Sequence, residues 1–234
     1  MPPPLQIGGI IYPRVDQADF TGPFEVLSRI PDSTFHVLWK DKQPVRDGRG
    51  LILTPDTSFD ECPGLDVLLI PGGGGQQALM DDDTVLSFIR RQSAGARYVL
   101  SVCTGALICG AAGLLVGRRA TTYWAAHHLL PYFGATPINA RFVEDGHLIT
   151  TAGVTAGIDG AFHLVAKLCG DRIAQEIQLY MQYAPEPPFD SGTPDRAPAE
   201  VLQAVRARAQ DLADRRLETA KRIALQLGVT PRHS

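Results

Sequence analysis

The chain of 234 residues has few cysteines, and none of them is spaced for a metal site. No C-x-x-C pair occurs, and no histidines lie near a cysteine at zinc spacing. The wide scatter also argues against a disulfide framework, so we expect reduced thiols and predict neither a metal nor another cofactor. The four cysteines are Cys62, Cys103, Cys109 and Cys169.

Long apolar runs and an excess of positive charge are absent too. No run of eighteen uncharged apolar residues occurs, and the amino terminus has no basic segment before an apolar one. We therefore expect a soluble, cytoplasmic protein with no membrane partner. The 22 lysines and arginines against 25 acidic residues give a net charge of −3, which disfavours nucleic acid as a partner and favours a small neutral ligand.

Short apolar runs alternate with helical patterns along most of the chain. This alternation is typical of βα units, and it predicts an α/β sandwich with a mainly parallel sheet and helices on both faces. Residues 48–55 and 140–144 resemble further strands, with an antiparallel arrangement left open. Strands are expected at residues 6–12, 35–40, 66–72, 98–103 and 147–153, and helices at 23–30, 83–94, 105–112, 155–168 and 170–183.

Composition divides the chain into three parts. We predict a catalytic domain over residues 1–184, a proline-rich loop over 185–198 and an amphipathic helical extension over 199–234. The helix of the extension is expected either whole or broken once. We expect it to pack on its own domain or on a second subunit, rather than on a membrane or nucleic acid.

Cys103 lies where a strand pattern passes directly into a helix, in the sequence S-V-C-T-G. This layout resembles a nucleophile elbow, in which the helix amino end and the next N–H group stabilise a thiolate. Burial of the thiol as a small apolar group is the alternative, because free cysteines are usually buried. The residues of this segment alone do not separate the two interpretations.

Two more segments follow strands that end at the same sheet edge. The glycine run at residues 72–75 would turn backbone N–H groups toward that edge and form an oxyanion hole, or else be a flexible turn. Asp19 is expected in a loop before a helix that starts at Pro23. It is either a solvated or capping carboxyl, or, beside a thiolate in an apolar crevice, a proton donor and acceptor with a raised pKa.

The histidines are placed poorly for a catalytic base, since Thr104 occupies the position directly after Cys103. We interpret five of them as structural or surface residues: His36, His127, His128, His147 and His163.

Several motifs together resemble the PfpI/ThiJ superfamily, which is related to the class I glutamine amidotransferases. They are D-F-T-G-P, L-I-P-G-G, S-V-C-T-G-A, A-A-G-L-L-V-G-R-R-A-T-T-Y-W and T-A-G-V-T-A-G-I-D, in the expected order within about residues 5–185. The resemblance implies a flavodoxin-like sandwich, a homodimer and a reactive cysteine on the elbow.

Within the superfamily, the chain most resembles the members that hydrate isonitriles, R–N≡C, to N-substituted formamides. That resemblance implies that Cys103 is the nucleophile, that Asp19 is the general acid and base, and that Thr104 supports activity. Gly72 and Gly73 would line the opposite side of a pocket for a neutral isonitrile, and no cationic group is expected there. PfpI-type proteases have histidine directly after the cysteine, so Thr104 argues against proteolysis.

Two other functions remain open. One is a glyoxalase- or deglycase-like activity on reactive carbonyl compounds, which usually goes with a glutamate and often a histidine near the cysteine. The other is a redox sensor or ligand-binding module, related to the sensor half of AraC-type regulators. Such regulators add two helix-turn-helix units, for which the fifty or so residues after Tyr183 are too few.

Overall fold

A computed structural model describes residues 3–231 of the chain, built around one seven-stranded sheet. The strand order is β10-β11-β7-β6-β1-β2-β5, and all neighbours are parallel except the antiparallel pair β10 and β11. The predicted α/β fold is confirmed. The strands are β1 (Leu5–Ile10), β2 (Ser33–Trp39), β5 (Thr57–Ser58), β6 (Val67–Ile70), β7 (Tyr98–Ser101), β10 (Phe142–Asp145) and β11 (Leu148–Thr151).

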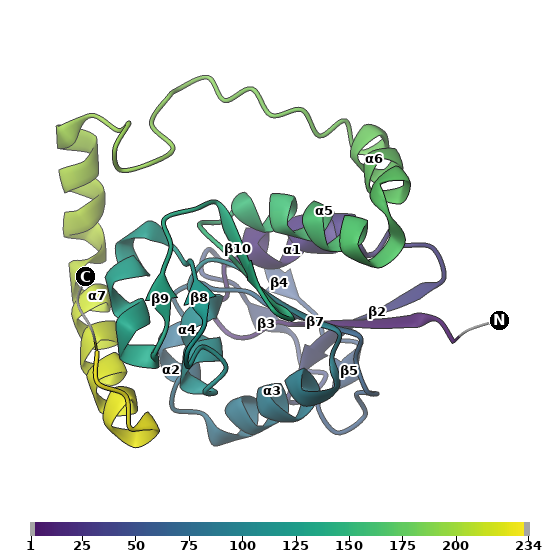
Figure 1. The fold of residues 1–234 in the computed structure, drawn as a ribbon, viewed down its shortest axis with the longest axis horizontal. Helices are drawn as coiled ribbons and strands as arrows, with labels where there is room; N and C mark the ends of the chain where they lie inside the picture. Colours follow the sequence, from purple (N-terminus) through teal and green to yellow (C-terminus); the bar gives the residue numbers. More distant parts are fainter. Residues whose placement is uncertain (1–2, 232–234) are drawn as a thin grey trace.

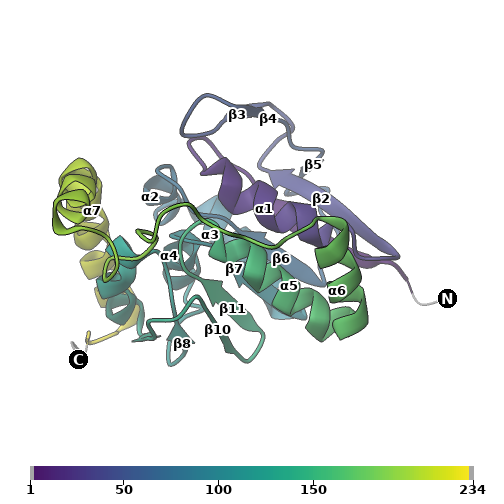
Figure 2. The same ribbon diagram turned by 90° about the horizontal axis from the view of Figure 1, so that it is seen from above.

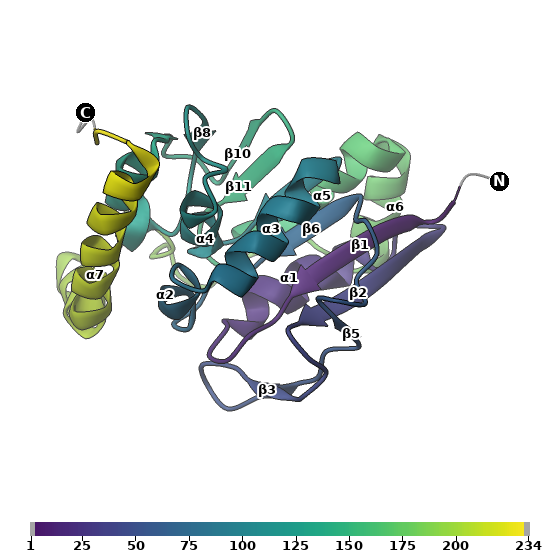
Figure 3. The same ribbon diagram turned by 90° about the horizontal axis from the view of Figure 1, so that it is seen from below.

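Helices cover both faces of the sheet (Figures 1 and 3). On one face α1 (Gln17–Leu27) packs beside α5 (Ala156–Cys169), and α6 (Asp171–Tyr180) packs on α5. On the other face lie α3 (Asp83–Gly95) and α4 (Gly105–Ala111), with the short α2 (Gln76–Leu79) beside them. Two helical layers explain why central strands such as β6 are apolar at every position.

The remaining strands are short. The hairpin of β3 (Val45–Arg46) and β4 (Ile52–Leu53) accounts for the strand pattern predicted at 48–55, and β10 for the one predicted at 140–144. A small two-stranded sheet, β8 (Arg119–Ala120) and β9 (Thr136–Pro137), flanks the 3-10 helix η1 (Trp124–Phe133).

Helix α1 starts six residues earlier than predicted, which moves Asp19 from a loop into the first helical turn. The side chain of Asp16 caps the helix by accepting a hydrogen bond from the Ala18 N–H at 3.1 Å. Pro23, predicted as the first helical residue, lies inside the helix instead. The difference matters because the direction of a side chain in a helix is fixed by the helix backbone, so the Asp19 carboxyl is held in one orientation.

The carboxyl-terminal helix α7 (Ala199–Leu227) is a single unbroken helix of 29 residues. It lies against η1 and α2, so it packs on its own chain, and a long connection from α6 reaches it across the molecule (Figures 1 and 2). Its buried apolar side chains are those of Ala220, Ile223 and Ala224. No helix within residues 3–231 is long and apolar enough to cross a membrane.

Candidate active site

Cys103 occupies the turn between β7 and α4, in the left-handed backbone region at φ 54°. A non-glycine residue rarely adopts this conformation, and such strain persists only where the surroundings enforce it. Two hydrogen bonds do so here: the Cys103 N–H donates to the Ala152 carbonyl at 2.9 Å, and the Thr122 hydroxyl donates to the Cys103 carbonyl at 2.7 Å. The predicted elbow geometry is therefore present, and it holds the thiol at the carboxyl edge of the sheet.

Asp19 lies beside this thiol and is fully buried. One carboxyl oxygen, Oδ2, accepts a hydrogen bond from the Gly72 N–H at 2.9 Å. The other, Oδ1, has no partner of good geometry among the described residues, although the Cys103 thiol is near enough to lower the pKa of Asp19. Burial first, and then the charge of Asp16, outweigh these effects and raise the Asp19 pKa to about 7.

The thiol itself is also hard to ionise. Burial raises the pKa of Cys103 well above its usual value, and the negative charge of Asp19 raises it further. The N–H groups of Thr104 and Val154 and the charge of Arg216 lower it by smaller amounts. The lowering expected from the elbow is thus present but outweighed. The two groups titrate as a coupled pair: the first proton leaves near pH 7 and the second only at much higher pH, so above about pH 7 the thiol and the carboxyl hold one proton between them.

The two glycines predicted to line the site are present there, but their N–H groups are already engaged. Gly72 donates to Asp19, as above, and Gly73 donates to the Thr104 hydroxyl oxygen at 3.2 Å. They therefore hold the two side chains in place rather than form an open oxyanion hole. A side chain at position 72 would not fit, because its Cβ would lie 2.6 Å from the Thr104 N and Oγ1 atoms.

Sequence reasoning missed a positively charged residue at this site. Arg216 of α7 is 8% exposed, and its Nη2 atom lies 3.1 Å from the Gly73 carbonyl and 3.4 Å from Thr104 Oγ1. The expectation that no cationic group faces the pocket is therefore wrong. It failed because a helix so far along the chain was treated as a separate extension.

A sequence signal for Arg216 did exist. On α7 it is spaced with Leu212, Ala220 and Ile223 as one helical stripe, and that stripe faces the protein. A charged residue within an apolar stripe needs a buried polar partner. Two tyrosines near the thiol also went unpredicted. Burial raises the pKa of both; for Tyr12 the charges of Asp19 and Cys103 add to this, and for Tyr123 the charge of Cys103 does.

No histidine within residues 3–231 hydrogen-bonds to Cys103 or Asp19. His36 contacts Gln6 at 2.8 Å and His163 contacts Glu144 at 2.6 Å, which are structural roles. In the same part of the chain no three acidic, cysteine or histidine side chains gather as a metal site. Among the described residues, Asp19 is the titratable side chain that lies next to the Cys103 thiol.

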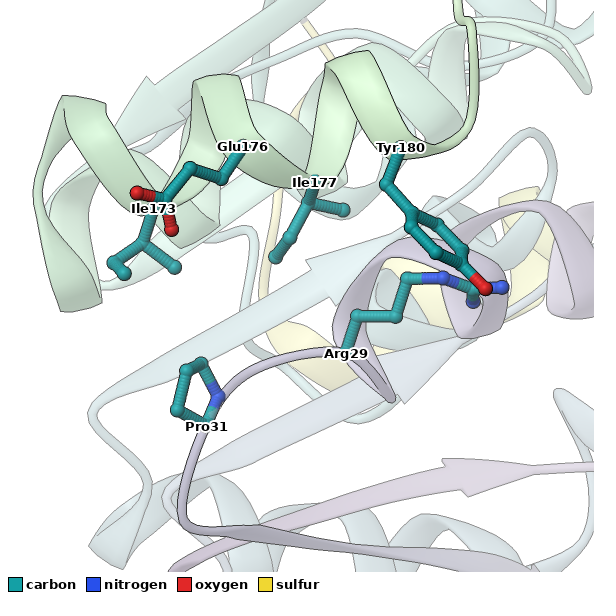
Figure 4. A pocket seen from close by; sticks show the side chains of 6 residues that line it. All are labelled: Arg29, Pro31, Ile173, Glu176, Ile177 and Tyr180. Atoms are coloured by element: carbon teal, nitrogen blue, oxygen red, sulfur yellow. The ribbon is translucent and has the colours of Figure 1, made fainter.

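A cavity of about 470 Å³ lies between α6 and the segment that follows α1 (Figure 4). It is open and lined by Arg29, Pro31, Ile173, Glu176, Ile177 and Tyr180. Arg29 and Pro31 connect the end of α1 to the start of β2, so the cavity is at the amino edge of the parallel strands. Cys103 is at the carboxyl edge, and the cavity cannot serve it.

Known proteins resemble this chain over most of its length. The profile of the DJ-1/PfpI family matches residues 9–167. An isonitrile hydratase of Pseudomonas putida is 52% identical over 225 residues, which cover 96% of this chain and 99% of that one. The transcriptional regulator GbdR of Pseudomonas aeruginosa is 30% identical over 64% of this chain, but that match spans 41% of the regulator.

The similarity extends to solved structures. A ThiJ/PfpI family protein from Pseudomonas syringae superposes with a TM-score of 0.90 at 37% identity, over 93% of this chain and 90% of that one. The uncovered 7% of this chain is shorter than the 29 residues of α7, so at least part of α7 has a counterpart in that structure.

Proposed function

The chain belongs to the DJ-1/PfpI family, and we propose that within it the chain is an isonitrile hydratase. The observation that carries the proposal is the 52% identity to an isonitrile hydratase over nearly the whole of both chains. The geometry supports it, because a carboxyl and a thiol that share one proton are what the hydration of R–N≡C requires. The homodimer and the cytoplasmic location expected from the sequence remain part of the proposal; light scattering after gel filtration would test the former.

In the first half of the reaction the terminal isonitrile carbon is attacked by the Cys103 sulfur. The thiol reacts as the thiolate, with the shared proton on Asp19, and that proton passes to the same carbon. One C–S bond and one C–H bond form, and the product is a thioimidate, Cys103–S–CH=N–R. Asp19 is left ionised. Its Oδ1 atom is free to make this transfer, since Oδ2 is held by the Gly72 N–H.

In the second half, the ionised Asp19 takes a proton from water as the water oxygen attacks the thioimidate carbon. Asp19 then passes that proton to nitrogen, which gives Cys103–S–CH(OH)–NH–R. As the C–S bond breaks, the hydroxyl proton returns to Asp19 and the formamide leaves. The pair again holds one proton, so water supplies every atom added after the first step.

Thr104 would orient the reacting groups. Its hydroxyl oxygen is held by the Gly73 N–H, and its own N–H faces the Cys103 sulfur. The substrate side chain would lie toward the half-buried Tyr123 and Trp124, since Tyr123 is close enough to respond to the Cys103 charge. Beside Trp124, a cavity of about 90 Å³ opens between α7 and residues 191–197.

Formamide production from one alkyl and one aryl isonitrile by the purified protein is the direct test. Cys103→Ala should abolish turnover, whereas the matched control Cys109→Ala, a buried cysteine in the helix that follows, should retain it. Mass spectrometry during turnover should find the mass of the isonitrile added to the Cys103 peptide. No formamide from the wild-type protein, or normal turnover by Cys103→Ala, would contradict the proposal.

A further inference from the structure

Arg216 is a buried guanidinium that has no carboxylate partner among the ion pairs of residues 3–231. Its acceptors are all neutral: Nε donates to the Gln76 side-chain oxygen at 2.9 Å, and Nη2 contacts the Gly73 carbonyl and the Thr104 hydroxyl. A buried charge without a counter-ion is costly, and burial lowers the pKa of Arg216. The guanidinium of Arg216 therefore has no carboxylate beside it to balance its charge in the resting site.

The groups that respond to the Arg216 charge are Cys103, Tyr12 and Tyr123. Both tyrosines have raised pKa values, and the Tyr12 hydroxyl donates to the Pro71 carbonyl at 2.8 Å. They stay neutral near pH 7. Of the three, Cys103 is the group that becomes an anion during the reaction, so the thiolate is the counter-ion that Arg216 otherwise lacks.

The contact with Thr104 has a second consequence. Thr104 Oγ1 accepts from both the Gly73 N–H and Arg216 Nη2. A hydroxyl oxygen has two acceptor positions and one proton to donate. With both acceptor positions filled, the hydroxyl proton points away from these donors and is available to a ligand.

We infer that Arg216 is a positioning residue for the hydration proposed above, brought into the site by α7. Its guanidinium holds the Thr104 hydroxyl as a hydrogen-bond donor toward the substrate, and it stabilises the Cys103 thiolate as the counter-charge. The carboxyl-terminal helix is thus a wall of the active site. The inference rests on the proposed function for its chemical meaning, although the effect on the thiol is measurable without any isonitrile.

The test compares Arg216→Met, which keeps similar volume without charge, with Arg216→Lys, which restores the charge without the planar fork. The matched control is Arg222→Met, because Arg222 anchors the same helix to Asp81 on the exposed surface and contacts none of the site residues. The first readout is the rate of Cys103 alkylation by iodoacetamide against pH, followed by mass spectrometry of the Cys103 peptide. The second is kcat and KM for an isonitrile.

Arg216→Met should shift the alkylation profile to higher pH. Arg216→Lys should have a profile close to that of the wild type, because it keeps the positive charge. Arg222→Met should titrate like the wild type. In turnover, Arg216→Met should lose roughly tenfold or more in kcat with a smaller change in KM, and Arg216→Lys should recover part of it. Asp19 of α1, whose charge also acts on the thiol, is unchanged in all three variants, and so is Asp16, the residue that caps α1 and whose charge acts on Asp19.

Two results would overturn the inference. One is an Arg216→Met protein that alkylates with the wild-type pH profile. The other is the same shift in Arg222→Met, which would mean that looser docking of α7 is the cause. If instead the wild type forms no formamide while the Arg216→Met shift is present, the proposed function fails and the assignment of Arg216 to the thiolate stands.

Discussion

Replacing Asp19 with asparagine should make the protein more stable, relative to the wild type, as the pH rises. The carboxyl is fully buried, and its pKa is raised from 3.8 to about 7, first by burial and then by Asp16. As the pH rises from 4 to above 7, the unfolded chain releases this proton while the folded chain still holds it, so the wild type loses stability. Asparagine keeps an oxygen for the Gly72 N–H and has nothing to ionise.

The rise from 3.8 to about 7 corresponds to about 4 kcal/mol, since each tenfold change in proton affinity is worth about 1.4 kcal/mol. The free energy of unfolding of Asp19→Asn, relative to wild type, should therefore increase by up to about 4 kcal/mol between pH 4 and pH 8.5.

Urea unfolding at several pH values and one fixed protein concentration measures this difference. The control is Asp32→Asn, an exposed aspartate at φ 52°, a conformation that asparagine accepts well. The free energy of unfolding of this control variant should change with pH in the same way as that of the wild type. Parallel stability curves for Asp19→Asn and wild type would refute the reasoning, because they would mean that Asp19 ionises as easily in the folded protein as in the unfolded chain.

Three further outcomes are expected. The pH profile of kcat/KM should rise through about 7 as the Asp19 and Cys103 pair loses its first proton. Asp19→Asn removes the proton donor and acceptor, so it should retain only residual turnover, and the rise in that residual activity should move to higher pH, toward the ionisation of the buried thiol alone; an unmoved profile would contradict the shared proton. Gly72→Ala should lose activity and roughly 1–3 kcal/mol of stability by denaturant unfolding, since its Cβ would meet Thr104 and Asp19; normal turnover would contradict that packing. Thr122→Val should cost roughly 1–3 kcal/mol by the same measurement, because it leaves the Cys103 carbonyl without its donor; a neutral effect would mean that the turn is held otherwise.

Much of the fold could be predicted from the sequence, because both its apolar runs and its helical spacing are local patterns. The elbow at Cys103 follows from a strand pattern that meets small residues. The expectation that Asp19 lies in a loop is wrong because Pro23 does not start the helix: Asp16 caps it, and it begins at Gln17. The division into a catalytic domain, a loop and an extension stays a prediction, and α7 contributes a residue to the site across any such boundary.

The electrostatics of the site could not be predicted from the sequence, because they depend on burial and on contacts between distant residues. An elbow alone favours a lowered thiol pKa, whereas complete burial beside Asp19 raises it. The glycine run predicted N–H donors at the sheet edge, but only the structure shows that these donors are used by Asp19 and Thr104.

Three costly features meet at one point in this protein: a left-handed Cys103, a buried carboxyl at Asp19 and a buried guanidinium at Arg216. Each reduces stability by itself, and strain or buried charge of this kind persists where it serves a site. In the resting pair the remaining proton is on the thiol, the weaker acid of the two, so the groups that act on Arg216 include no anion until the thiolate forms. The positive charge of Arg216 therefore favours the ionised sulfur, although Arg216 lies 112 positions along the chain from Thr104, the neighbour of Cys103 that it contacts. Loss of the positive charge should change the ionisation of the sulfur more than it changes the stability of the fold. The alkylation profile of Arg216→Met is therefore a more discriminating measurement than its stability.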